Sequence, residues 1–232
     1  MNKTKKLLFG TIILLVTCYS QLATAAKPNP TLFPIDSYPY GKSYGVWGQE
    51  FAQWVYQFSL ADYPLFQGDG PADCNANQSG KVLFLYGVLE GAVSRSCTIP
   101  QGKPIYIAVN NTLAFVPVFG SNEAEIREDA QRDLAGVSRL EVVIDGVPLD
   151  DPFSYRATSP DGGFVFSIAE GSILNEIGFD AGDYAPAIID GYSVMLPPLS
   201  TGEHVIQWGS SGVFQDGTPY SYDATWYITV GN

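Results

Sequence analysis

Apolar and aromatic side chains near the N-terminal end repeat with the period of an α-helix. In the stretch YGVWGQEFAQWVYQF, residues 44–58, glutamines and Glu50 occupy most of the arc opposite the rings. The apolar side chains on one face are Tyr44, Trp47, Phe51, Trp54, Val55 and Phe58. Their spacing predicts an amphipathic helix over residues 44–59, with Ser43 as its cap.

The aromatic face of this helix has two interpretations that spacing does not separate. Burial of a large ring contributes about 1.5–3 kcal/mol, so a helix beside a sheet normally packs such a face into the core. Rings that bind sugars stand exposed instead, and Tyr44, Trp47 and Trp54 are the possible ligand-facing aromatics. We expect core packing, with the ligand platform and a partner-protein surface as alternatives.

After residue 80 the apolar pattern changes to that of β-strands. Residues 81–86 and 104–109 are short apolar runs, separated by a predicted turn at 97–103 whose Pro and Gly break the pattern. From residue 138 apolar and polar side chains alternate, and Asp145-Gly146 predicts a tight turn. Further strands are predicted at 153–158, 163–168, 192–196, 203–209 and 222–230. A second helix, facing solvent, is predicted from Asn122 to Leu134, ended by Gly136.

This order of elements predicts a mainly β protein, with a β-sandwich or jelly-roll-like body, an N-terminal amphipathic aromatic helix and one short surface helix. Residues 26–40 are rich in proline and predict an extended arm. The remainder, residues 41–232, has no repeat and no linker, so we expect a single domain.

Residues 1–25 have the three-part pattern of an export signal. Lysines come first, an apolar run follows from Leu7 to Val16, and Ala23-Thr24-Ala25 ends the segment. We expect cleavage near Ala25 and a secreted or periplasmic protein. Lipid attachment at Cys18 is the alternative, but Thr17 stands where a smaller residue is usual.

The charge of the chain narrows the class of partner. The chain carries 24 acidic against 12 basic residues, a net charge of −12, and loss of the three lysines within residues 1–25 lowers it to −15. Such a surface repels phosphate backbones and anionic lipid heads. The sequence therefore disfavours nucleic-acid and membrane partners, and it does not set the oligomeric state.

Cys74 and Cys97 form an even pair in a chain predicted to be exported. An oxidising compartment favours one disulfide between them, which stabilises the fold by about 3 kcal/mol on the chain-entropy model. Two thiols and a single histidine do not make an ordinary four-ligand zinc site.

A calcium site is a weaker prediction. Asp73 and Asn75 place oxygen atoms at alternate positions, as a calcium loop does, but Gln78 replaces the glycine of an EF-hand. A looser Ca²⁺ site using Asp69 or Asp73 stays open. No other cofactor is predicted, because phosphate-binding and dinucleotide motifs are absent from the sequence.

Catalysis has two possible routes in this sequence. A serine triad would have to use His204, the single histidine, and no Gly-x-Ser-x-Gly motif accompanies it, so a structural role is expected. A glycosidase needs two carboxylates about 5 to 10 Å apart, and no pair stands out. The candidates for that pair are Asp145, Asp150, Asp151, Asp190 and Glu203.

Several motifs resemble an uncharacterised family of bacterial secreted proteins. They include Gly41-Lys-Ser-Tyr-Gly-x-Trp47, Asn77-Gln-Ser-Gly80, Arg95-x-Cys97-Thr-Ile-Pro-Gln-Gly-Lys103 and Pro197-Pro-Leu-Ser-Thr-Gly-Glu-His-Val-Ile206. The resemblance implies that the two cysteines, Trp47 and Trp54 belong to a shared framework, and it implies no activity. The chain departs from the family at Leu83-Phe-Leu-Tyr-Gly87, where a strand of the type Trp-Phe-Leu-Ala-Gly is expected.

Together these patterns predict an exported, non-catalytic binding or scaffolding protein. Glycan or cell-surface material is the leading ligand class, because Gly- and Asp-rich loops at one end of a sandwich are a natural binding site. The alternative is a secreted carboxylate-dependent hydrolase of the glycosidase type.

Overall fold

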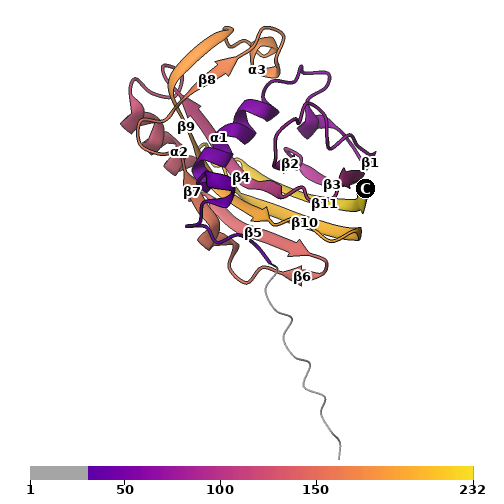
Figure 1. Ribbon diagram of the computed structural model, residues 1–232. Coiled ribbons are helices and arrows are strands. Elements are labelled where there is room, and N and C mark those ends of the chain that lie inside the picture. Colours follow the sequence, from indigo (N-terminus) through magenta and orange to yellow (C-terminus); the bar gives the residue numbers. More distant parts are fainter. Residues whose placement is uncertain (1–30, 232) are drawn as a thin grey trace, which may run out of the picture.

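The structure is a computed structural model that describes residues 31–231 (Figure 1). The predicted export signal, Cys18 and the first residues of the arm lie outside the described residues. Within residues 31–231, every helix is too short or too polar to cross a bilayer.

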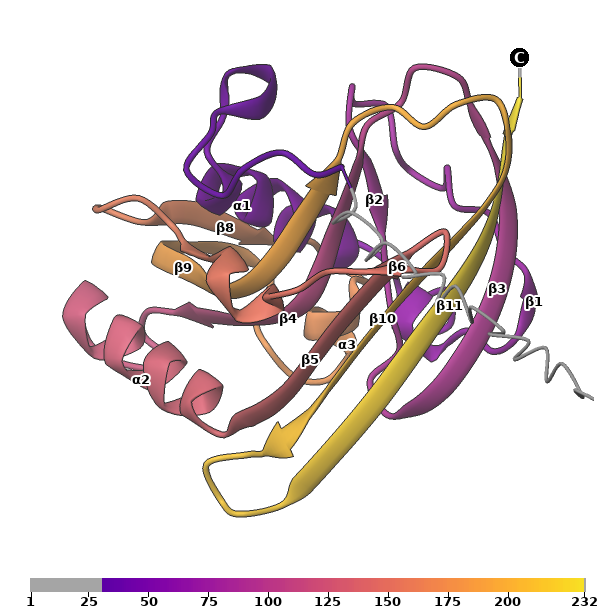
Figure 2. The ribbon, with the colours of Figure 1, turned by 90° about the horizontal axis from the view of Figure 1, so that it is seen from below.

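Two packed β-sheets form the body of the protein, as the sequence predicts (Figures 1 and 2). The first sheet has the order β1 (Gly70–Pro71), β3 (Gly91–Pro100), β11 (Pro219–Gly231), β10 (Gly202–Val213), β5 (Val137–Ile144) and β6 (Val147–Pro148). The second has the order β2 (Leu83–Leu85), β4 (Ile105–Phe115), β9 (Gly182–Leu196) and β7 (Arg156–Thr158), and β8 (Phe164–Ile168) also pairs with β9.

Alternation along the long strands places the core between the sheets. On β11, Ala224, Trp226 and Ile228 are buried whereas Tyr227 between them is half exposed. On β10, Ile206 and Trp208 are buried in register with Trp226 and Ala224. Because successive strand side chains point to opposite faces, this pattern gives the first sheet one apolar face toward the second.

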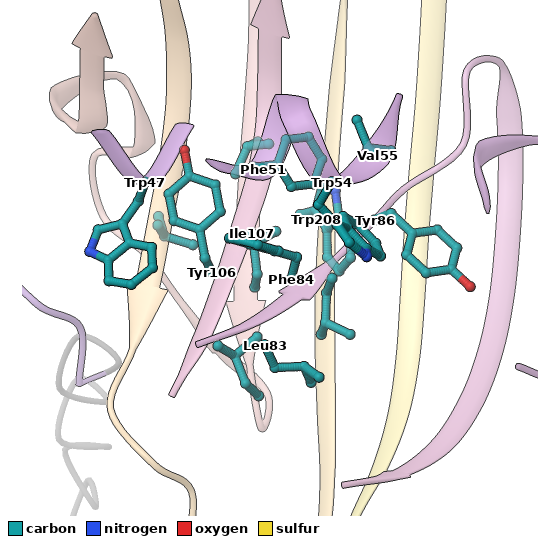
Figure 3. Packing of buried hydrophobic residues seen from close by; sticks show 14 of the residues in the cluster. Trp47, Phe51, Trp54, Val55, Leu83, Phe84, Tyr86, Tyr106, Ile107 and Trp208 are labelled. Atoms are coloured by element: carbon teal, nitrogen blue, oxygen red, sulfur yellow. The ribbon is translucent and has the colours of Figure 1, made fainter. Parts of the chain in front are cut away.

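Helix α1 (Tyr44–Val55) lies against the second sheet, and its rings are in the core (Figure 3). Its Phe51 ring lies 5.8 Å from Phe84 of β2 and 6.0 Å from Tyr106 of β4. A Cβ at Gly45 would come within 2.0 Å of the Thr158 carbonyl oxygen, so glycine allows the helix to approach β7 closely.

The helix begins where the sequence predicts and ends four residues earlier. The Ser43 hydroxyl accepts a hydrogen bond from the Val46 amide, which is an ordinary helix cap. Beyond Val55 the chain turns away, and the carbonyl of Phe58 accepts a hydrogen bond from the amide of Ile173. This tertiary bond gives the Phe58 carbonyl a partner outside any helix.

The second predicted helix is confirmed as α2 (Glu123–Ala135), with Asn122 as its cap and Gly136 at its end. Its buried side chains Ile126, Ala130 and Leu134 pack toward β4 and β9. A further short helix, α3 (Ile173–Glu176), was not predicted.

The predicted turn at 97–103 is wrong in its first half. Strand β3 continues to Pro100 because it pairs in parallel with β11, from Gly91 opposite Tyr222 to Pro100 opposite Gly231. Only Gln101 and Gly102 form a turn. The predicted strand at 153–158 begins as a 3-10 turn, Pro152–Tyr155, and only its second half is β7.

The turn at Asp145-Gly146 is confirmed. Both residues have positive φ, 51° and 73°, and they join β5 to β6 as the residue types predict. The described part of the N-terminal arm lies on the domain, since the Phe33 amide donates to the Met195 carbonyl and the Phe33 carbonyl accepts from the Tyr44 hydroxyl.

The predicted disulfide joins Cys74 to Cys97, with 6.0 Å between their Cα atoms. It fastens the loop after β1 to the middle of β3. The 23-residue separation encloses β2 and the loop that follows it, so one covalent bond restrains both.

Replacing both cysteines with alanine should lower the free energy of unfolding by about 3 kcal/mol, because the unfolded chain regains the entropy of an open loop. Urea denaturation followed by tryptophan fluorescence measures this. Wild-type protein in excess reductant is the matched control and should show the same loss. A loss below about 1 kcal/mol in both samples would contradict the loop-entropy argument.

Candidate functional site

An internal hollow of about 230 Å³ lies where the two sheets, α1 and α2 meet, and we term it the inter-sheet cavity. Its apolar walls are Phe51, Val55, Leu65, Val88, Leu89, Ala108, Leu134 and Phe214. Its polar and aromatic walls are Tyr56, Tyr63, Gly87, Asn110, Asn111, Thr112, Asp133, Trp208, Tyr220 and Tyr222. Apolar walls with a few placed polar groups are typical of small-molecule sites.

A β-bulge in β4 brings polar side chains into this cavity. The register with β9 shifts between Ala108 and Asn110. Beyond the shift the Asn110 amide crosses to the first sheet, where its Nδ2 donates to the hydroxyls of Ser210, at 2.7 Å, and Tyr220, at 2.9 Å. The Tyr222 hydroxyl donates back to the Val109 carbonyl at 2.6 Å. These bonds fix the polar wall.

The indole nitrogen of Trp208 is unusual among the tryptophans. Trp47, Trp54 and Trp226 each donate their Nε1–H to a backbone carbonyl, of Pro39, Ala76 and Tyr86 respectively. Trp208 is 2% exposed, and its Nε1 has no hydrogen-bond partner in the described part of the chain. A buried donor without a partner costs about 1–3 kcal/mol, so it marks a place where an acceptor is expected.

Gly87 lies directly against that nitrogen. A Cβ added at Gly87 would be 3.3 Å from Trp208 Nε1, tighter than ordinary van der Waals contact. Both residues line the cavity, and glycine at 87 allows the backbone to pass close to the indole ring.

Exposed side chains mark the entrance of the cavity. Phe214, at the tip of the β10–β11 hairpin, is 51% exposed, and Leu89 is 48% exposed. The Phe214 ring lies 4.7 Å from Tyr220, whose ring stacks 6.2 Å from Tyr222. This series of rings leads from the surface into the cavity.

The buried guanidinium of Arg95 holds the other wall in place. Arg95 is 1% exposed and donates to the carbonyls of Gly87, at 2.7 Å, Pro64, at 3.3 Å, and Gln67. It also donates to Gly68 and Tyr86 at 3.4 Å and lies 4.9 Å from the Tyr86 ring. Burial lowers the pKa of Arg95, but an arginine stays charged in a protein, and five carbonyl contacts replace its hydration.

The ionisable side chains that line the cavity are tyrosines and one aspartate. Burial raises the pKa of Tyr56, Tyr63 and Tyr222, so these phenols stay neutral. Asp133 is the single carboxylate among the described lining residues, and it accepts from Thr112 at 3.1 Å and Gln215 at 2.6 Å.

The structure places the three possible ligand-facing aromatics of the helix in the core. Tyr44, Trp47 and Trp54 are 1%, 4% and 6% exposed. The Tyr44 hydroxyl donates to Phe33 and accepts from the Met195 amide, so its polar atom is used internally. None of the three lines the inter-sheet cavity.

The residues suggested for calcium bind the backbone. Asp69 accepts from the Ser94 backbone amide at 2.7 Å, and Asp73 accepts from the Asn75 backbone amide. The Asn75 side-chain Nδ2 donates to the Thr98 carbonyl. No group of three or more His, Cys, Asp or Glu side chains suited to a metal occurs within residues 31–231. The Ca²⁺ site stays a prediction.

The five carboxylates considered for catalysis are separate from the cavity. Asp190 forms a two-pronged ion pair with Arg156, with distances of 2.9 and 3.0 Å, and Glu203 accepts from Thr229. The backbone carbonyl of Asp151 accepts a hydrogen bond from the Ser154 hydroxyl, and Asp150 is the preceding residue.

The imidazole of His204 lies beside a carboxylate and a serine, Asp145 and Ser200, which the sequence pattern did not identify as its neighbours. Its Nδ1 lies 2.7 Å from Asp145 Oδ2, and its Nε2 lies 3.0 Å from the Ser200 carbonyl and 3.3 Å from the Ser200 hydroxyl. A triad base must offer an unprotonated Nε2 to the serine. Here both ring nitrogens face acceptors, which favours the imidazolium and a structural latch between β10 and the Asp145 turn.

The residue pattern along the chain did not predict the lining residues of the cavity. Asn110-Asn-Thr112 is a polar interruption in an otherwise apolar strand and also matches a glycosylation acceptor. Tyr220 and Tyr222 share one strand parity and could have been recognised as a ring pair. Nothing local distinguishes Trp208 from the other tryptophans.

Neither the family models nor the curated proteins include a match to this chain. Among solved structures, a chain from the complex of PbICP-C with falcipain-2 is 11% identical, with a TM-score of 0.24 over 66% of this chain and 100% of its own. The cysteine protease inhibitor EhICP2 from Entamoeba histolytica is 12% identical, with a TM-score of 0.24 over 71% of this chain and 99% of its own.

A third structure, the 2,6-sialyltransferase of Photobacterium sp. JT-ISH-224, is 11% identical with a TM-score of 0.21, over 61% of this chain and 18% of its own. These values support no conclusion about function. The resemblance to a family of bacterial secreted proteins stays a prediction.

Arg95→Lys should lower the free energy of unfolding by about 2–3 kcal/mol, because an ammonium cannot reach the carbonyls that the planar guanidinium bridges. Urea denaturation measures the loss. Arg132→Lys, on an exposed face of α2, is the matched control and should change stability by less than about 0.5 kcal/mol. Equal, small effects at both positions would contradict the role given to Arg95.

His204 should make stability depend on pH in a defined direction. Burial opposes protonation, but the hydrogen bonds to Asp145 and the Ser200 carbonyl outweigh it and raise the pKa of His204 above 6.5. A raised folded-state pKa gives stabilisation that is complete below the unfolded-state pKa and is lost as pH rises through the folded-state value.

The stability difference between wild type and His204→Asn should therefore be larger at about pH 5.5 than at about pH 8.5. Because the chain has one histidine, other titrations largely cancel in this difference. Asp145→Asn should reduce the same pH dependence. A difference that is constant between the two pH values would show that the latch does not depend on the imidazolium.

Proposed function

We propose that this protein is an exported, non-catalytic binding protein whose inter-sheet cavity holds a small amphipathic molecule that carries a hydrogen-bond acceptor. The observation that carries the proposal is the buried Nε1–H of Trp208, which has no partner in residues 31–231 and lies on the cavity wall. A ligand carbonyl or ether oxygen beside it would remove an energetic cost that the free protein bears.

The shape and lining of the cavity support a small and partly aromatic ligand. A volume of about 230 Å³ suits one ring with a short substituent better than an oligosaccharide. Phe51 and Val55 supply apolar surface, whereas Asn111 and Thr112 are polar lining residues whose side chains bond Ser193 and Asp133. Rings at the entrance, Phe214 and Tyr220, provide faces along which a planar molecule can enter.

A binding role is favoured over the alternative hydrolase by the arrangement of carboxylates. Glycoside hydrolysis needs two facing acids, and Asp133 is the single acid among the described residues of the cavity. The Asp133 carboxylate also accepts hydrogen bonds from Thr112 and Gln215. Export itself rests on the predicted signal at residues 1–25 and on the disulfide, which is typical of oxidising compartments.

Acetophenone and α-methylstyrene test the proposal, because they have nearly the same shape and only acetophenone has a carbonyl acceptor. Acetophenone should bind about tenfold more tightly, equivalent to one hydrogen bond of about 1.4 kcal/mol. Two-dimensional ¹⁵N–¹H spectra of the indole N–H groups report binding, and the Trp208 signal should shift most. Trp208→Phe identifies that signal and should make the two affinities equal.

Ala108→Leu should fill the cavity and weaken both probes, and Ala92→Leu, on an exposed part of β3, is the matched control. If neither probe shifts the Trp208 signal more than those of Trp47, Trp54 and Trp226, the cavity is not the binding site. Equal affinity for the two probes in wild type would reject the role of the indole N–H.

A further inference from the structure

A second hollow, of about 460 Å³, lies between the start of α1 and the segment 77–84 inside the disulfide loop. We term it the lysine groove. Its exposed rim is made of Tyr40, Gln57, Asn77, Ser79 and Lys81, and Lys42 and Glu50 lie on its wall. It shares no lining residue with the inter-sheet cavity, so it is a separate site.

The lysines of residues 31–231 all gather at this groove. Lys42 and Lys81 line it, and the Lys103 ammonium donates to the carbonyl of Gly80, another lining residue. Lys42 pairs with Glu50, whereas Lys81 lies over the Tyr40 ring, 4.4 Å from its centroid. Lys81 and Lys103 have no carboxylate partner in the described part of the chain.

The arginines do not offer a comparable exposed charge. Arg95 is buried, and the other four, Arg127, Arg132, Arg139 and Arg156, each form an ion pair with an acid. Within residues 31–231, the groove is therefore where uncompensated positive charge reaches the surface of an acidic chain. Because Lys42 and Glu50 offset each other, Lys81 leaves the groove with a net positive charge, which attracts anions.

The backbone around the groove is also strained. Tyr40 has a φ of 55°, a region that a bulky residue rarely adopts, whereas Asn77, with a φ of 54°, lies in a turn, where asparagine commonly adopts it. The third non-glycine residue of this kind in residues 31–231, Asp145, is explained by its tight turn. Strain of this type concentrates at functional sites, where it presents a side chain in a required direction.

The rim combines the groups that recognise acidic sugars. Gln57 and Asn77 offer amides for hydroxyl groups, and Lys81, which lies over the Tyr40 ring, offers an ammonium for a carboxylate. The buried Trp47 and Trp54 form the floor through their ring atoms, since their nitrogens bond Pro39 and Ala76. We propose that the lysine groove binds a glycan that carries carboxylate groups, independently of the inter-sheet cavity.

Isothermal titration with oligogalacturonate and a neutral galactan oligosaccharide of equal length tests this proposal. Oligogalacturonate should bind, and the neutral oligosaccharide should bind at least about fivefold more weakly, the equivalent of one exposed ion pair. Affinity should fall between about 20 and about 200 mM salt, because an open groove is screened.

Lys81→Gln should weaken oligogalacturonate binding about fivefold, and Lys81→Arg should retain most of it. Arg132→Gln removes the same charge from α2, outside the groove, and should change the affinity less than about twofold. Equal effects of Lys81→Gln and Arg132→Gln would overturn the proposal, since only net charge would then matter.

Two further results would overturn the acidic-glycan assignment. One is equal affinity for the neutral and the carboxylated oligosaccharide. The other is tighter binding of a single-stranded DNA of the same net charge, which would identify a general polyanion site. The Trp208 signal should still respond to acetophenone in Lys81→Gln, so failure at the groove is distinguishable from failure at the cavity.

Discussion

The hydrogen bonds of the buried Arg95 guanidinium hold one wall of the inter-sheet cavity in place. The guanidinium gathers carbonyls from the segment 64–68 and from Tyr86 and Gly87, which regular strand pairing does not satisfy. A buried charge is tolerated only when such partners replace its hydration. The same contacts hold the segments that place Leu65 and Gly87 at the inter-sheet cavity, so internal solvation of one cation also shapes a cavity wall.

The Cys74–Cys97 disulfide restrains the same loop, residues 74–97, at its two ends. Cys97 lies two residues after Arg95 on β3, and Cys74 begins the loop that contains the lysine groove and then β2. The disulfide restrains this loop at Cys74, and the hydrogen bonds from Arg95 restrain it at Tyr86 and Gly87. Apart from β2, the loop has no regular secondary structure between Cys74 and β3. Two separate hollows can therefore persist on either side of it, one mostly apolar and one with exposed lysines.

Much of the fold was predictable because periodicity is a local property. The spacing of Tyr44, Trp47 and Phe51 predicted α1, the Asn122 cap predicted α2, and alternation predicted most of β10 and β11. The early residues of β3 were missed because Gly91-Ala-Val-Ser-Arg-Ser96 shows only weak alternation, and its pairing partner lies more than a hundred residues away in β11. Parallel pairing of that kind leaves no turn signal between the two strands.

By itself the sequence determined the aromatic face of α1, the Cys74–Cys97 pair and the acidic excess of the whole chain. Tertiary structure alone decided which of four tryptophans lacks a partner, since Trp208 differs from Trp226 only in the carbonyl that packing brings to its nitrogen. It alone brought Lys42, Lys81 and Lys103 together at one groove. The physical reason is that hydrogen-bond satisfaction and local charge depend on distances through space, which residue order does not encode locally.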